Sequence, residues 1–216
     1  MKKAKNMLIG IGFGILCLIL STAAALGLLH GCDLLYRATV DGLHLPETTG
    51  YSREVILRNY RDVMRYLSPF HGGDFELSDL RFSAGGAQHF ADVKAIFNGV
   101  YLAGAVSLLG IAVILTANKR RRRDFLRTSG ITTLTLPGIV AVGVIINFSA
   151  IFILFHQLFF RNDLWIFDSW EDEVINILPQ QFFMNCAIMI VVFWLLAAAL
   201  QFWVSHRIRR KKQNQL

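Results

Sequence analysis

The sequence predicts an all-α integral membrane protein with four transmembrane helices, both chain ends in the cytoplasm and a small extracytoplasmic cap. Three observations carry this prediction: the composition, the length of four uncharged runs, and the sign of the charges between them. Of the 216 residues, 54% are hydrophobic and only 17% are charged, whereas a soluble domain has about 25% charged residues. This composition excludes an ordinary soluble domain and indicates a chain that lies in a bilayer.

Four runs without a charged residue define the expected spans. They cover residues 7–29, 95–117, 131–155 and 182–204. Each run is longer than the roughly 20 residues that a helix needs to cross about 30 Å of hydrocarbon. We therefore predict a single membrane domain over residues 1–216. Its remaining parts are two extracytoplasmic cap segments, 30–94 and 156–181, and a cytoplasmic loop, 118–130.

The charges outside these runs sort by sign. The two chain ends and the loop 118–130 together hold fourteen Lys or Arg residues and one acid, whereas the two cap segments hold eight basic and fourteen acidic residues. Cytoplasmic segments of membrane proteins are enriched in Lys and Arg, so we expect both chain ends in the cytoplasm. The net charge of +7 thus reflects membrane topology, and no nucleic-acid partner is expected.

The cap segment 30–94 is predicted to contain an amphipathic helix. Five apolar residues that follow Ser52, a residue type that commonly begins helices, recur on one helix face. They are Ile56, Tyr60, Val63, Met64 and Leu67. Ser68 and Pro69 are expected to end this helix. Residues 76–82 are expected to form a short strand or an extended stretch.

Two histidines are the strongest candidates for chemistry, because the topology brings both to the outer boundary of the membrane. His89 lies six residues before the run 95–117, and His156 directly follows the run 131–155. Near neutral pH, a histidine can act as general base, general acid or hydrogen-bond donor. Asp92 follows His89 by three residues, so on a helix it could orient the imidazole or attract a cationic amine. A carboxylate that stabilises the start of the helix is the alternative.

The segment after His156 is unusually rich in aromatic rings. Phe155, Phe159 and Trp165 are expected to shape a site beside the histidines, although an aromatic belt at the membrane interface would also explain most of these rings. Asp172 lies among them, and we expect it to turn towards the histidines, since carboxylates near apolar walls are often functional or paired.

Other chemistries lack their usual motifs. The sequence contains no His-Glu-x-x-His metal helix, no Gly-x-Ser-x-Gly turn and no glycine-rich phosphate loop, which argues against a protease and a serine acyl-enzyme. His89, Asp92 and His156 would suffice in number for an open metal site, but their spacing is generic, and we predict no metal. A non-catalytic membrane protein whose cap binds an envelope protein or a lipid is the main alternative to an enzyme.

Two strings around the histidines carry a resemblance to a known family. They are residues 89–94 (HFADVK) and 155–160 (FHQLFF), and they are followed by Trp165, Asp172 and Pro179. Together with the four spans and the outer cap, they resemble the lipoprotein intramolecular transacylase (Lit) family of low-GC Gram-positive bacteria. The resemblance covers nearly the whole chain and includes both histidines.

The resemblance implies a multi-pass acyltransferase of the bacterial cell membrane, with its active site on the extracytoplasmic face. Its substrates would be diacylglyceryl lipoproteins in the outer leaflet of the cytoplasmic membrane, surrounded by membrane lipids. The sn-2 acyl chain would move to the α-amino group of the lipoprotein's own N-terminal cysteine, which gives the lyso-form. We expect His156 to be the base and His89 its partner. No cofactor is expected, because the acyl donor is the substrate's own ester.

Overall fold

The structure of the protein is a computed structural model that describes residues 2–118 and 122–213. Within these residues the chain is helical and contains no strand. The long helices are α1 (Lys2–Gly31), α5 (Ala84–Ala117), α6 (Arg122–Phe159) and α8 (Gln180–Gln213). The short helices are α2 (Leu34–Gly42), α3 (Leu45–Thr49), α4 (Arg53–Leu67) and α7 (Val174–Ile177).

Four helices of the described chain are long and apolar enough to cross a membrane, as predicted. They are Lys3–Gly31, Ala84–Ala117, Phe125–Phe159 and Gln180–Arg210, with mean hydropathies from 2.2 to 2.5. Each contains one of the four uncharged runs. The chain divides into two compact units. Unit 1 comprises residues 1–26, 100–143 and 188–216, and unit 2 comprises residues 27–99 and 144–187.

Unit 1 is held together by close helix contacts and a buried polar cluster. A Cβ added to Gly10 of α1 would lie 2.7 Å from Thr128 Cβ of α6, so only glycine allows the two helices to approach this closely. The Nε2 amide of Gln201 in α8 donates to Thr133 Oγ1 of α6 at 3.1 Å, and its Oε1 accepts from Ser129 Oγ. These bonds satisfy polar groups that hydrocarbon would leave unpaired.

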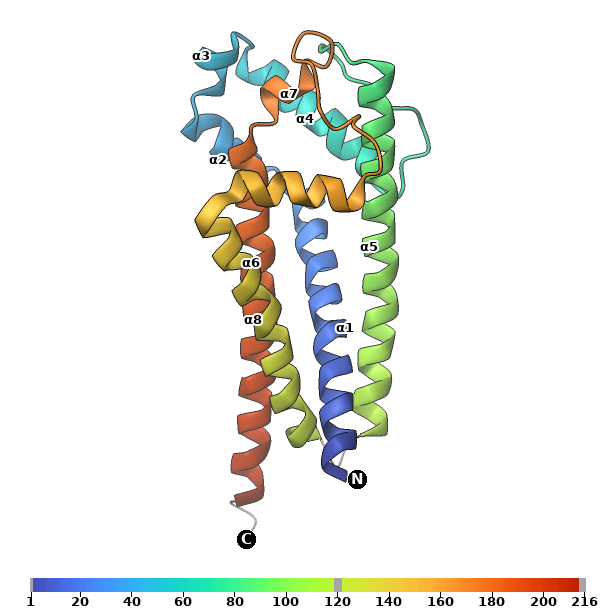
Figure 1. Cartoon of the computed structure of the whole chain (residues 1–216), viewed down its shortest axis with the longest axis vertical. Helices are drawn as coiled ribbons and strands as arrows, with labels where there is room; N and C mark the ends of the chain where they lie inside the picture. Colours follow the sequence, from blue (N-terminus) through green and yellow to red (C-terminus); the bar gives the residue numbers. More distant parts are fainter. Residues whose placement is uncertain (1, 119–121, 214–216) are drawn as a thin grey trace. The chain divides into compact units, whose positions relative to one another are not determined.

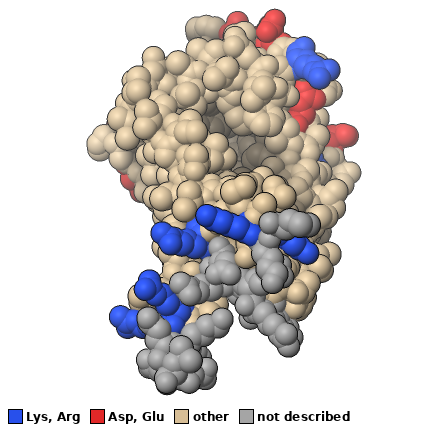
Figure 2. Space-filling view, turned by 60° about the horizontal axis from the view of Figure 1, so that its bottom comes forward, with Lys and Arg blue, Asp and Glu red and all other residues tan. Residues whose placement is uncertain are grey.

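One end of unit 1 is basic. Its exposed basic side chains gather on the face shown in Figure 2. They are Lys3, Lys5, Arg127, Arg207, Arg209 and Arg210. Among the side chains of unit 1 that the structure describes, none is Asp or Glu. The charge sorting seen in the sequence therefore persists in three dimensions.

Unit 2 has its own hydrophobic core around α4. The rings of Tyr36 and Tyr60 stack with centroids 3.7 Å apart, and Phe182 packs edge-on against both. The Tyr36 hydroxyl donates to the Ile177 carbonyl at 2.7 Å, which joins α2 to α7. The predicted amphipathic helix is present as α4, and the Ser52 hydroxyl accepts a hydrogen bond from the Val55 amide at its start.

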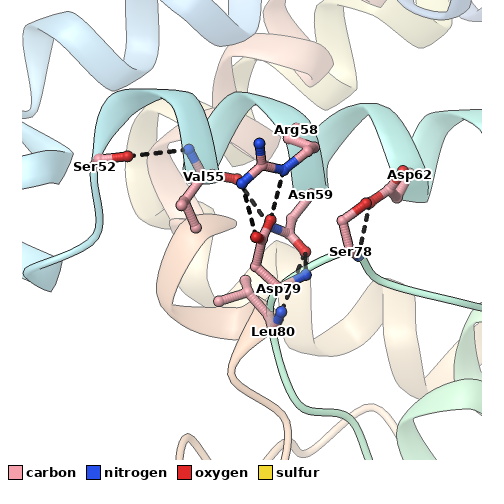
Figure 3. Close-up of polar contacts among 8 residues, drawn as sticks. All are labelled: Ser52, Val55, Arg58, Asn59, Asp62, Ser78, Asp79 and Leu80. Carbon is pink, nitrogen blue, oxygen red and sulfur yellow. Dashed lines mark hydrogen bonds and ion pairs between the residues drawn. The ribbon is translucent and has the colours of Figure 1, made fainter.

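Residues 76–82 form no strand, because their backbone bonds to side chains instead of to another strand. Asn59 of α4 accepts from the Asp79 and Leu80 amides at 3.1 and 3.3 Å, and Asp62 accepts from the Ser78 amide at 2.9 Å (Figure 3). Arg58 binds both carboxylate oxygens of Asp79 at 2.7 and 2.8 Å, and these hydrogen bonds lower the pKa of Asp79 below its usual range. The segment that leads into α5 is thus fixed on α4.

The helix α6 is broken near its C-terminal end. Asn147 has the non-helical angles φ −161° and ψ 91°, and its side-chain oxygen accepts from the Ala150 amide at 3.0 Å, as a helix N-cap does. Residues 148–159, here called the arm, form the helical segment that follows this break (Figure 1, gold). The arm packs on the start of α8, where Phe152 and Phe183 are 5.3 Å apart and Gln180 donates to Ser149 at 2.6 Å.

Candidate active site

The structure brings the two predicted histidines together in unit 2. His89 lies in the second turn of α5, and His156 lies near the end of the arm. Their ring centroids are 6.0 Å apart with an interplanar angle of 29°. Only 6% of His89 and 8% of His156 is exposed. Two titratable side chains are thus buried side by side, although they are 67 positions apart in the sequence.

Aromatic rings enclose this pair. Phe160 contacts both imidazoles, with centroid distances of 4.8 Å to His89 and 5.4 Å to His156. Phe167 packs against His89 at 5.3 Å, and Trp165 packs against His156 at 4.9 Å. Surroundings of this kind exclude water and strengthen the hydrogen bonds made inside them.

The two imidazoles differ in their hydrogen bonds. His156 Nδ1 lies 2.7 Å from the Phe152 carbonyl oxygen. Because a carbonyl only accepts, Nδ1 carries the proton, and the neutral ring keeps its lone pair on Nε2. His89 Nδ1 is buried and has no hydrogen-bond partner among the described residues. A buried polar atom without a partner costs free energy, so this nitrogen is available to a ligand.

Asp92 does not hydrogen-bond either histidine in the described structure. Its Oδ1 accepts from Gln88 Nε2 at 2.9 Å, and its Oδ2 accepts from Asn162 Nδ2 at 3.0 Å. Asn162 belongs to the segment that follows the arm. Asp92 therefore connects the helix of His89 to the chain that leaves His156.

Asp172 lies at the start of α5 and does not turn towards the histidines as expected. It is 5% exposed and accepts from the Ser83 amide at 2.8 Å and the Ser83 hydroxyl at 3.0 Å. The same hydroxyl accepts from the Gly86 amide at 2.9 Å. A Cβ at Gly86 would lie 2.1 Å from Asp172 Oδ1. Asp172 thus fixes the first turn of α5, one turn before His89.

Only some of the predicted aromatic residues contact a histidine. Phe155 lies edge-on to His156 at 5.5 Å, and Trp165 is a wall of the pocket. Phe159 packs on Phe155 at 4.7 Å and is 51% exposed, and its ring does not pack on either histidine in the described structure. Sequence reasoning gave too little weight to Phe152 and Phe160. Their spacing of four residues on either side of His156 was the signal that places them on its face.

The described residues contain no group of three His, Cys, Asp or Glu side chains that could hold a metal ion. His89, Asp92 and His156 are therefore not arranged as a metal site in this structure.

The fold and the site together define an integral membrane protein with two buried, adjacent imidazoles in an aromatic environment. The sequence model of the family "Lipoprotein intramolecular transacylase Lit" matches residues 8–183. The chain belongs to this family and is an acyltransferase. Family membership thus decides for the enzyme over the non-catalytic membrane protein. No curated protein matches the chain significantly.

Solved structures agree over the full length. The chain is similar to the membrane-integral lipoprotein intramolecular transacylase Lit from Bacillus cereus, with a TM-score of 0.90 and 29% identity, over 97% of this chain and 98% of that chain. Structures of the Bacillus cereus protein with a histidine-to-arginine and a histidine-to-alanine mutation match with TM-scores of 0.86 and 0.85, each at 29% identity. They cover 100% and 98% of this chain, and 96% and 97% of theirs.

Proposed function

We propose that His89 and His156 are the acid–base pair with which this lipoprotein transacylase moves an acyl chain. The substrate is a diacylglyceryl lipoprotein, whose sn-2 acyl group moves to the α-amino group of its own N-terminal cysteine. The observation that carries the proposal is the 6.0 Å separation of two buried imidazoles. Two imidazoles at this spacing can both reach the amine and the ester of one bound substrate.

His156 serves as the base. Its Nδ1 donates to the Phe152 carbonyl, which leaves the Nε2 lone pair to accept a proton. The α-ammonium group has a reference pKa of about 8, so the neutral α-amine, the form that attacks, is readily available near neutral pH. As its nitrogen attacks the sn-2 ester carbonyl, the nitrogen–carbon bond forms and one proton of the attacking amine passes to His156.

His89 serves as the partner of His156 and acts on the oxygen atoms of the ester. Its buried Nδ1 has no hydrogen-bond partner in the part of the chain that the structure describes, so it is available to the substrate. In the imidazole tautomer that carries its proton on Nδ1, this nitrogen donates a hydrogen bond to the developing oxyanion. When the ester carbon–oxygen bond breaks, the proton taken from the amine ends on the glyceryl oxygen. The products are an amide and an alcohol, and no oxidant or cofactor enters the balance.

The surrounding residues favour transfer over hydrolysis. Phe160, Trp165 and Phe155 keep water from the ester, and Phe159 extends the aromatic wall. Because donor and acceptor belong to one molecule, orientation supplies much of the rate; well-oriented intramolecular reactions reach effective molarities of about 10⁵ M or more. Asp92 and Asp172 act as positioning residues through Asn162 and Ser83.

The active site faces the outside of the bacterial cell membrane in this proposal. The positive-inside rule supports this face, since the two chain ends and the loop 118–130 hold fourteen of the 22 basic residues, whereas the cap segments hold fourteen of the fifteen acidic residues. Lipoproteins anchored in the outer leaflet then reach the histidines with their amine at the membrane boundary.

Tandem mass spectrometry of a reporter lipoprotein tests the proposal. The reporter is made with and without this protein in a host that leaves diacyl ends, and its N-terminal lipopeptide is fragmented, because the transfer conserves intact mass. We expect fragments with an acylated α-amine and a monoacyl glyceryl group. His89→Ala and His156→Ala should abolish this product, whereas His206→Ala, which changes an exposed histidine of unit 1, should not. Full activity in either pocket variant would remove that histidine from the mechanism.

A further inference from the structure

A hollow lies on unit 2, at the N-terminal end of α5. Its volume is about 600 Å³. Its lining combines an indole, a guanidinium, a carboxylate and a short irregular segment of backbone. The lining residues are Leu80, Arg81, Phe82, Ser83, Trp170 and Glu171. None of them contacts the imidazoles in the described structure, so the hollow is a separate feature.

Trp170 is exposed on a rigid turn. Trp170 is 78% exposed, whereas its backbone amide donates to Asp168 Oδ1 at 2.8 Å. The Asp168 carbonyl accepts from the Glu171 and Asp172 amides at 3.1 and 2.8 Å. These bonds hold the backbone of the turn, and the exposed indole of Trp170 lines the hollow. Tryptophan is a residue type that often anchors a partner.

Arg81, which also lines the hollow, is held by hydrogen bonds as well. Arg81 Nη2 contacts Glu173 Oε1 at 2.7 Å, and the Arg81 amide donates to Glu173 Oε2 at 2.8 Å. The Glu173 amide in turn donates to the Arg81 carbonyl at 3.1 Å. A guanidinium has five N–H donors, and 67% of this side chain remains exposed. Arg81 is thus held in place with donors left for the carbonyl oxygens of a ligand.

Two routes along the chain limit the distance from this hollow to His89. Along α5, Ser83 precedes His89 by six residues, which is about 9 Å of helix rise. Along the other segment, Phe167 packs on His89 at 5.3 Å, and Trp170 follows Phe167 by three residues, so their Cα atoms are at most about 11 Å apart. The Ser83 edge of the hollow therefore begins roughly 10 Å from His89.

We propose that this hollow binds the polypeptide of the lipoprotein substrate, about three residues after the lipidated cysteine. This inference rests on the proposed function, because that function places the cysteine's amine between the histidines. The polypeptide leaves the same cysteine through its carbonyl group. An extended chain advances about 3.3–3.6 Å per residue, so three residues cover the separation. Trp170 packs on a side chain there, and Arg81 donates to backbone carbonyls.

An exposed tryptophan can also anchor a protein in lipid headgroups. The two roles differ in their dependence on the substrate. A membrane anchor acts on every substrate alike, whereas a polypeptide site acts only on substrates long enough to reach it. Substrate length is therefore the variable to change.

The experiment uses the full chain in lipid nanodiscs and synthetic substrates with an N-terminal dipalmitoylglyceryl-cysteine. One substrate is the cysteine amide alone, and the others carry one to five further residues. Tandem mass spectrometry of the N-acyl product gives kcat/KM for each. We expect kcat/KM to rise sharply when the third residue is added. In Trp170→Ala the ratio of kcat/KM for the longest substrate to that for the amide should fall about tenfold, because interface tryptophans carry much of the binding free energy.

Phe70→Ala is the matched control, because Phe70 is a 97% exposed aromatic residue of unit 2 that does not line the hollow. Its ratio should equal that of the unchanged protein. Equal slowing of all substrates by Trp170→Ala would assign the indole to the membrane and overturn the inference. So would a kcat/KM that does not depend on substrate length. Absence of N-acyl product from every substrate with the unchanged protein would overturn the proposed function itself.

Discussion

The side-chain amide of Asn162 donates to Asp92 at 3.0 Å, across 70 positions of sequence. This bond joins the helix that carries His89 to the segment that follows His156. The bonds between Asp172 and Ser83 make a second polar link between this segment and the start of the same helix. We therefore expect the pair of Asn162 and Asp92 to act as positioning residues for the imidazoles.

Breaking this bond should slow the chemical step more than it weakens binding. We expect Asn162→Ala to lower kcat about three- to tenfold with little change in KM, because small displacements of catalytic groups cost rate. Asn162→Asp should lower kcat further, since it sets two carboxylates against each other. Asn98→Ala, which changes an exposed residue of α5, is the control. An increase in KM alone would assign Asn162 to substrate binding.

Phe160 should control the choice between acyl transfer and hydrolysis. It is the ring that contacts both imidazoles, so Phe160→Ala opens the pocket to water at the point where the ester reacts. We expect the ratio of free fatty acid to N-acyl product to rise. Mass spectrometry of both products measures that ratio. Leu158→Ala alters a 72% exposed residue of the arm and should leave it unchanged. An unchanged ratio in Phe160→Ala would show that other residues exclude the water.

The four long helices and the proximity of the two histidines could be predicted from the sequence, because the hydrocarbon core of a membrane restricts which structures a chain can form. A run without charges must form a helix there, and consecutive helices return the chain to alternate faces. His89 and His156 border runs that end on the same side, so topology alone places them at one level. The contact with Phe160 was also within reach, since it follows His156 by one helical turn.

The roles of the carboxylates could not be predicted, because their partners are remote in sequence. Asp172 is bound by Ser83, 89 positions away, and Asp92 by Asn162, 70 positions away. The break in α6 was hidden for a different reason. Asn147 sits in an uncharged run that looks like one continuous span, and only its cap bond to Ala150 reveals the change of direction.

Acid should destabilise unit 2 through Asp79. Its pKa is lowered in the folded protein, first by hydrogen bonds from Arg58, so the interaction stabilises the fold above the unfolded pKa of about 3.9. This stabilisation is lost as pH falls through the folded pKa. We expect Asp79→Asn to have a lower Tm than the unchanged protein at neutral pH. The difference between the two Tm values should become smaller at about pH 3. Thermal unfolding in detergent at both pH values checks this. A constant Tm gap would show that the pair contributes nothing measurable.

Gly86 should be the least replaceable glycine of α5. A Cβ there would lie 2.1 Å from Asp172 Oδ1, so Gly86→Ala must displace the carboxylate that binds Ser83. Overpacking of this kind costs roughly 1–3 kcal/mol, and the first turn of α5 would shift together with His89. We expect a lower Tm and a lower kcat. Gly99→Ala is the matched control on the same helix, because a Cβ at Gly99 meets nothing within 4 Å and alanine favours helix by about 1 kcal/mol. Equal stability of the two variants would mean that Asp172 can move without loss and is not what fixes the start of α5.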